Sequence, residues 1–136
     1  MARTLQVAID CADPAALSRF WAEALGYVLN PPPEGHDSWE SFLTAIGVPE
    51  SEWNSASALI DPDGTGPRIY FQRVPEEKAG KNRLHLDVRV PGGREAISSE
   101  VERLHALGAS VVGPKEERGE YWVVLRDPEG NEFCLT

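Results

Sequence analysis

The chain has 136 residues, of which 41% are hydrophobic and 26% are charged, and these values suit one globular domain. Its net charge of −9 argues against nucleic acid and anionic membranes as partners, since both need a basic surface. No apolar run approaches the length of a membrane span, and the start MARTLQVAID does not resemble a signal peptide. Cys11 and Cys134 are the only cysteines, so no disulfide framework is expected. We therefore expect a cytoplasmic protein.

The first half of the chain, residues 1–74, predicts a strand, a helix and three strands. TLQVAID alternates apolar and polar residues as a strand does. ADPAALSRFWAEALG predicts a helix with Asp13 as N-cap, Pro14 in the first turn and Gly26 at its end. Further strands are expected in YVLN, SASALIDPDG and PRIYFQRV.

An insertion at about 37–53 separates two strands of this half and contains a short helix in DSWESFLTAIG. Trp39, Phe42 and Trp53 lie within it. They form either a small satellite core or a lid over a binding site, because long loops in compact domains are often functional.

The polar segment PEEKAGK, residues 75–81, is expected to link the first half to the second, residues 82–136. NRLHLDVRV, residues 82–90, predicts a strand with an apolar face and a face that contains His85 and Asp87. A helix in GGREAISSEVERLHALG and strands in ASVVG, YWVVLRDPEG and NEFCLT should follow. The order of elements in the first half is therefore repeated.

The two halves are also related in sequence. LQVAID aligns with LHLDVR, and ALIDPDGTGPRIYF aligns with VVLRDPEGNEFCL, with Thr65 and Gly66 as an insertion. We therefore predict an α+β fold of two tandem βαβββ units in one domain, each with its helix on one sheet face and with the other faces forming a cup. In this alignment Gln6 is equivalent to His85, and Tyr70 to Cys134.

Alternation along the strands places a set of residues on the predicted cup wall. His85 is the best candidate for a catalytic or ligand-contacting residue, although a polar strand residue satisfied by water is the alternative. Asp87 lies two residues along the strand, too far from His85 for an ideal dyad. Cys134 is expected to be a small buried residue. The predicted ligand-binding set is Gln6, Tyr70, Gln72, His85, Asp87, Trp122 and Cys134.

The paired units, the ending DPEGNEFCL and the strand NRLHLDVRV resemble the vicinal oxygen chelate superfamily, which includes glyoxalase I, bleomycin-resistance proteins and extradiol dioxygenases. QRVPEEKAGKNRLHLDV is most similar to small bacterial glyoxalase-like domain proteins. The resemblance implies metal-ligand positions at Gln6, Tyr70, His85 and Cys134. The first and third match residue types that the superfamily uses, whereas both expected glutamates are missing.

The resemblance leaves two classes of function open. One is a bleomycin-resistance-like protein that binds a small organic molecule and has no cofactor. The other is a lyase, isomerase or dioxygenase that uses a divalent metal held partly by Gln6 and His85. The missing glutamates favour the binder, although Asp10, Asp87 or Glu132 could replace them. The resemblance also implies a homodimer.

A basic cluster lies at the junction of the two halves. Arg73, Lys78, Lys81 and Arg83 either bind an anionic ligand group or form a solvated linker.

Overall fold

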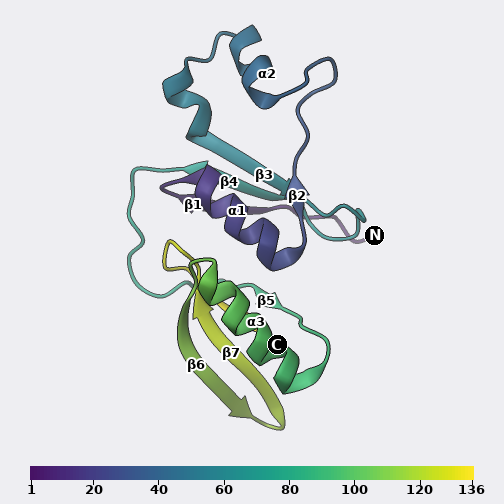
Figure 1. Ribbon diagram of the computed structural model, residues 1–136, viewed down its shortest axis with the longest axis vertical. Coiled ribbons are helices and arrows are strands. Elements are labelled where there is room, and N and C mark those ends of the chain that lie inside the picture. The colour runs from purple at the N-terminus through teal and green to yellow at the C-terminus, as the bar shows by residue number, and fades with distance from the viewer. The chain divides into compact units, whose positions relative to one another are not determined.

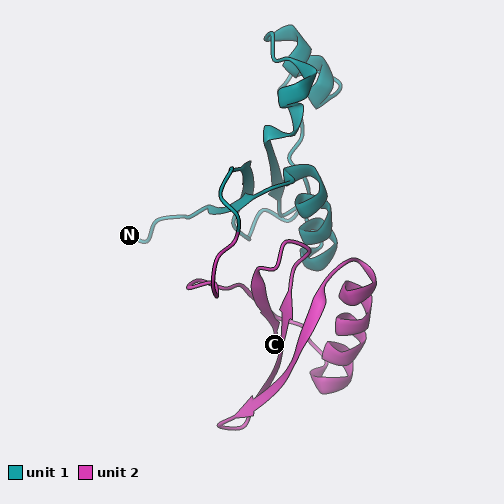
Figure 2. Ribbon diagram, turned by 90° about the vertical axis from the view of Figure 1, so that its left-hand side faces the viewer, with its two compact units in different colours: residues 1–77 teal, residues 78–136 magenta.

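The computed structural model describes residues 1–136 as two compact units, residues 1–77 and 78–136 (Figure 2). The division falls inside the segment 75–81 that the sequence predicts as a linker. Each unit has a four-stranded sheet in which the first strand is parallel to the last. The predicted α+β fold of two tandem βαβββ units is therefore confirmed.

The sheet of the first unit has the strand order β1-β4-β3-β2. Its core lies between this sheet and α1, which crosses one sheet face in Figure 1 and contacts β3 and β4. Leu17, Phe20 and Trp21 of α1 are buried, as are Ile69 and Phe71 of β4. The elements are β1 (Val7–Cys11), α1 (Pro14–Leu25), β2 (Val28–Leu29), α2 (Trp39–Ala45), η1 (Glu50–Ser55), β3 (Ala56–Ile60) and β4 (Ile69–Arg73).

The ends of α1 form as the sequence predicts. The Asp13 carboxylate accepts a hydrogen bond from the backbone N–H of Ala16, and Pro14 occupies the first turn. Gly26 ends the helix with φ of 69°, a left-handed conformation that glycine adopts without a Cβ penalty. None of the helices has the length and apolar composition that crossing a membrane requires.

The insertion folds into α2 and the 3₁₀ helix η1, and neither has a buried residue. The Trp39 indole donates a hydrogen bond of 2.8 Å to the Asn30 carbonyl and packs edge-to-face against Phe42. The Trp53 indole donates one of 3.1 Å to the Val48 carbonyl. These aromatic residues thus form local contacts within and beside the insertion. A lid function remains a prediction.

The sheet of the second unit has the order β5-β8-β7-β6, with α3 packed against β6 and β7 (Figure 1). Ile97 and Leu104 are the buried residues of α3. The elements are β5 (Asp87–Val88), α3 (Gly93–Ala106), β6 (Ser110–Glu117), β7 (Glu120–Arg126) and β8 (Glu132–Leu135).

The predicted strand over residues 82–90 is mostly wrong, because β5 contains only Asp87 and Val88. β5 is an edge strand whose parallel partner, β8, has only four residues. The Asn82 N–H, which a longer ladder would pair with backbone, donates to the Glu132 carboxylate instead. Leu84, expected on an apolar face, is 90% exposed.

Equivalent turns support the repeat between the units. In the first unit the Asp61 carboxylate accepts hydrogen bonds from the backbone N–H groups of Asp63 and Gly66. In the second, the buried Asp127 carboxylate accepts from the N–H groups of Glu129 and Asn131. Both aspartates stand at the same place in the aligned DPDG and DPEGN segments. The aspartate of this motif therefore organises the turn in each unit.

Candidate functional site

The two faces of the second sheet differ in composition. Leu125, Phe133 and Leu135 are almost fully buried and lie on the side of α3. Because successive strand residues point to opposite faces, Val124 and Cys134 lie on the other side. These two residues are partners in the register of β7 and β8. We call the side opposite α3 the distal face of the second unit.

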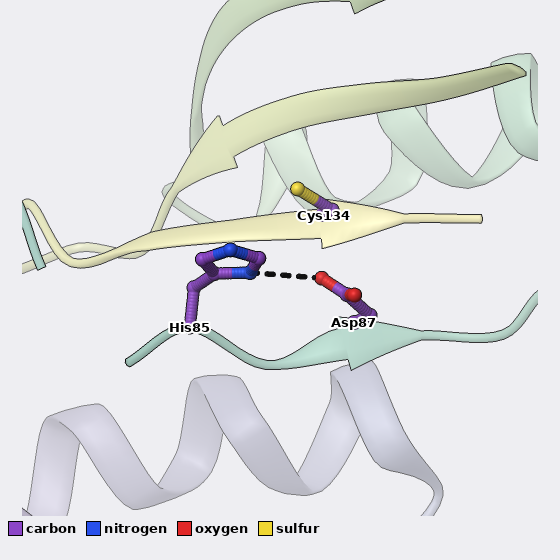
Figure 3. Close-up of side chains that lie close together, drawn as sticks. All are labelled: His85, Asp87 and Cys134. Carbon is purple, nitrogen blue, oxygen red and sulfur yellow. Dashed lines mark hydrogen bonds and ion pairs between the residues drawn. The ribbon is translucent and has the colours of Figure 1, made fainter. Parts of the chain in front are cut away.

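His85, Asp87 and Cys134 form one cluster, the His85 cluster, on this distal face. Their potential ligand atoms all lie within 4.8 Å of one another. Asp87 on β5 is paired in register with Cys134 on β8. Figure 3 shows the imidazole of His85 and the carboxylate of Asp87 facing each other, beside the Cys134 side chain. Three of the seven predicted ligand-binding residues are thus brought together.

The expectation that Asp87 is too far from His85 for a dyad is wrong. His85 Nδ1 lies 2.9 Å from Asp87 Oδ1. His85 precedes β5 in irregular backbone, so its side chain does not follow the spacing of a pleated strand. In the neutral tautomer with its proton on Nδ1, the imidazole donates to this carboxylate and presents Nε2 as an acceptor. The His85 side chain is 42% exposed, so this acceptor is accessible.

Cys134 is buried, as the sequence predicts, and is only 8% exposed. Burial raises the pKa of the Cys134 thiol, and the neighbouring Asp87 carboxylate raises it further. The Lys81 ammonium acts in the opposite direction. At neutral pH the thiol is therefore protonated, which makes it a poor nucleophile.

Glu132 is held by several donors and does not join the His85 cluster. Its Oε2 accepts a hydrogen bond of 2.9 Å from the Asn82 N–H and lies 3.3 Å from Lys78 Nζ. The Asn82 hydrogen bond, with help from Lys78, lowers the pKa of Glu132 to about 2. This carboxylate thus fastens residues 78–82 to β8.

Arg68 contacts two of the predicted site residues of the first unit, and Gln72 pairs with Asp10 instead. The Arg68 guanidinium donates a hydrogen bond of 2.8 Å to Gln6 Oε1 and lies 5.7 Å from the centre of the Tyr70 ring. Gln72 Nε2 donates to Asp10 Oδ1 at 3.3 Å. Arg68 is not among the predicted site residues, although its place two residues before Tyr70 puts it on the same face.

Trp122 on β7 is half-buried and is the only tryptophan of the second unit. It is paired in register with Lys115 on β6. Alternation places it on the distal face with Val124, outside the His85 cluster.

The donor atoms of the His85 cluster determine which metal it suits. One nitrogen, one carboxylate oxygen and one sulfur match a borderline ion such as zinc, which catalytic sites often hold with three protein ligands. Hard ions such as Mg²⁺ and Mn²⁺ prefer oxygen ligands and suit this group less well. The group therefore fits zinc, provided that Cys134 loses its proton on binding.

Comparison with known proteins agrees with the repeated fold. A family model described as a glyoxalase-like domain matches residues 6–136. No protein with a curated description matches the chain.

Several solved structures are similar along nearly the whole chain. A glyoxalase/bleomycin resistance protein/dioxygenase family enzyme from Burkholderia phytofirmans PsJN is 23% identical, with 96% of this chain and 94% of that chain covered and a TM-score of 0.67. A possible glyoxalase from Bacillus cereus is 16% identical, with coverage of 100% and 99% and a TM-score of 0.67. A mutant of the fosfomycin resistance protein FosX from Listeria monocytogenes, in complex with Mn(II) and 1S,2S-dihydroxypropylphosphonic acid, is 14% identical, with coverage of 99% and 90% and a TM-score of 0.67.

The TM-scores over nearly whole chains establish a shared fold, and the family model establishes the family. Since the model covers almost all of the sequence, the chain belongs to the glyoxalase-like domain family.

Proposed function

We propose that the protein binds a small organic molecule on the distal face of the second unit, at the His85 cluster, without a full metal site. The observation that carries this proposal is the hydrogen bond of 2.9 Å between His85 and Asp87. It fixes the imidazole and leaves Nε2 as an accessible acceptor for a ligand donor. A bleomycin-resistance-like binder is the class of function that this arrangement supports best.

Apolar and aromatic surface beside the cluster supports an organic ligand. Val124 and Trp122 lie on the same face, and binding sites commonly combine such surface with a few polar groups. Gln6, Tyr70 and Gln72 remain proposed ligand contacts of the first unit. The Gln6 side-chain oxygen already accepts a hydrogen bond from Arg68. We therefore assign Gln6 to contact with the organic ligand in preference to metal binding.

A screen of aromatic and apolar fragments tests the proposal. We expect some compounds to raise the melting temperature and to quench tryptophan fluorescence, since a ligand of the folded state stabilises it. His85→Ala and Trp122→Ala should each weaken binding by about fivefold or more, equivalent to about 1 kcal/mol. His36→Ala removes a histidine from the first unit and serves as the matched control. Binding that neither substitution changes would refute the proposed site.

A zinc-dependent activity is the second candidate, and the donor set of the His85 cluster favours it. His85, Asp87 and Cys134 would hold the ion, which would polarise an oxygen of a bound substrate. Lyases, isomerases and dioxygenases are the reaction classes that the superfamily suggests.

Metal analysis distinguishes the two candidates. The metal-free binder predicts sub-stoichiometric metal after purification without chelators and no thermal shift with Ni, Zn, Mn or Fe. The second candidate predicts a Co²⁺ complex with a thiolate charge-transfer band, which Cys134→Ala abolishes and Cys11→Ala retains. If the charge-transfer band is absent and the purified protein contains sub-stoichiometric metal, the metal site is refuted.

We also propose a homodimer and a cytoplasmic location. Sedimentation equilibrium tests the first, since a dimer has twice the mass of the 136-residue chain. Fractionation of the source cells tests the second.

A further inference from the structure

A groove on the second unit has a charge opposite to that of the chain as a whole. Its volume is about 700 Å³. The chain has a net charge of −9, yet four cationic side chains line this groove beside a single carboxylate. The cations are Lys78, Lys81, Lys115 and Arg126, and the carboxylate is Glu132. The lining thus has an excess of three positive charges.

Glu132 already forms ion pairs with two of the four cations, so it does not neutralise the positive charge of the other two. Its oxygens lie 3.3 Å from Lys78 Nζ and 3.8 Å from Arg126 Nε. Lys115 forms no ion pair, and the Lys81 ammonium donates only to the Asn82 carbonyl, at 3.3 Å. Like charges gathered in one groove repel one another, and a bound anion would relieve this repulsion.

The groove is built into the fold rather than spread over mobile side chains alone. The Glu132 carboxylate fastens Asn82 and Lys78 to β8 and so positions the segment that supplies Lys81. Arg126 and Lys115 come from the paired strands β7 and β6. Val112 and Val124 add apolar surface to the lining.

The groove adjoins the His85 cluster. Val124, which lines the groove, is the register partner of Cys134. The Lys81 ammonium is close enough to Cys134 to act on its thiol electrostatically. A small molecule that contacts both the groove and His85 would pass over Val124 and Cys134.

We propose that this groove binds an oxyanion, a carboxylate or a phosphate group, on a small organic molecule. Lys81, Lys115 and Arg126 hold the oxyanion, and Val112 and Val124 contact the apolar part. The inference rests on the proposed function, because it assigns a chemical class to the molecule bound on the same face. The acidic chain as a whole repels polyanions, so a small monoanion or dianion suits the groove better than nucleic acid.

Matched probes test the charge requirement. Benzoate and benzamide have nearly the same shape but differ in charge, and phenyl phosphate distinguishes a phosphate site from a carboxylate site. Titrations of the ¹⁵N-labelled full chain at low salt are followed by amide chemical shifts. We expect benzoate or phenyl phosphate to shift the amides of residues 112, 115, 124 and 126 and to bind at least about fivefold more tightly than benzamide. Added NaCl should weaken this binding.

Substitutions test the location. Lys81→Gln with Lys115→Gln should weaken binding of the anionic probe about tenfold, since each removes an unpaired cation. Arg118→Gln removes a cation of the same unit outside the groove and should change the affinity by less than about twofold. Glu132→Gln should tighten binding, because the amide retains an acceptor for the Asn82 N–H while the negative charge is lost.

Three results would contradict the proposed anion-binding groove. Equal binding of benzamide and benzoate at the groove would leave the proposed binding function intact but refute the anion. Anion binding unaffected by the double substitution would place it elsewhere. No shift of the groove amides with any probe would refute the groove, and failure of the fragment screen as well would refute both proposals.

Discussion

Asp87 interacts with two neighbours in different ways. It accepts a hydrogen bond from His85 and thereby fixes the imidazole. Its charge also disfavours the thiolate of Cys134, which burial already opposes. A single carboxylate therefore keeps the histidine oriented and the cysteine protonated. For this reason, a substitution of Asp87 changes the chemistry of both residues.

Alkylation of Cys134 should report the effect of Asp87 on the thiol. Replacing Asp87 with Asn removes a negative charge, so the pKa of Cys134 should fall toward its ordinary value. We expect the alkylation rate with iodoacetamide at pH 7.5 to rise about threefold, because the thiolate is the reactive form. Mass spectrometry of the peptide that contains Cys134 measures this rate, with Cys11→Ala present throughout.

Glu117→Gln is the control for a carboxylate lost elsewhere in the second unit, and it should leave the rate unchanged. An Asp87→Asn rate equal to that of the parent, with the fold intact by circular dichroism, would show that burial alone controls the thiol.

The sequence identified the residues of the His85 cluster but not how two of them interact. The repeat and the alternation select His85, Asp87 and Cys134 as residues of one sheet face. The contact between His85 and Asp87 depends on backbone that departs from a strand before β5. No local pattern indicates where that departure begins, since it depends on the length of the partner strand and on the Glu132 side chain.

At the scale of elements, the start of α1 is tied to η1 of the insertion. Asn54 Nδ2 donates a hydrogen bond of 2.8 Å to the Asp13 carboxylate, and Asn54 Oδ1 accepts one of 2.8 Å from the Ala15 N–H. Two residues far apart in sequence therefore cap the same helix. The hydrogen bond from Asn54, followed by that from the Ala16 N–H, lowers the pKa of Asp13.

Asp13→Ala should lower the free energy of unfolding by about 1 kcal/mol at pH 7, the usual cost of a lost N-cap. Asp13→Asn retains an acceptor and should cost less. Because the pKa of Asp13 is lower in the folded state, its charge stabilises the fold above about pH 4, and this contribution is lost as the pH falls through the folded-state pKa. Urea unfolding at pH 7 and at pH 3 measures the difference in stability between the parent chain and the Asp13→Asn variant.

Asn54→Ala provides the test of coupling between the two caps. If Asn54 acts partly through Asp13, the double substitution with Asp13→Ala should cost less than the sum of the single effects. Additive effects would contradict the coupling. A pH-independent difference between the parent and Asp13→Asn would contradict the lowered pKa of Asp13.

Helices were easier to predict than strands because their signals are local. Asp13 and Gly26 define the ends of α1, and both functions follow from neighbouring backbone groups. Strand ends depend on partners that are distant in sequence. Backbone hydrogen bonds join the β5 region to the β8 region only from Leu86 to Val90, whereas β6 extends to Glu117 because β7 remains paired with it up to Glu120. Alternation in NRLHLDVRV continues beyond the backbone pairing, so the predicted strand was too long.

At the scale of the whole molecule, each unit contains all the strands of its own sheet and the helix that covers it. The duplicated sequence predicts this organisation, since each repeat encodes a complete βαβββ unit. Phe71 and Phe133 are the buried phenylalanines of the last strand of each unit, 0% and 1% exposed respectively. Each therefore reports on the core of its own unit.

Matched substitutions of these two residues should reveal whether the units also lose structure separately. Phe71→Leu and Phe133→Leu each replace a buried ring by a smaller apolar side chain, at an expected cost of about 1 to 1.5 kcal/mol, which leaves the chain folded. Because opening can be local, Phe71→Leu should accelerate amide hydrogen exchange mainly in residues 1–77, and Phe133→Leu mainly in residues 78–136. Exchange followed by mass spectrometry measures both. Equal acceleration in both units by either substitution would contradict this expectation. It would mean that the most protected amides exchange only when the entire chain unfolds. The two units would then form one cooperative folding unit, although each has its own core.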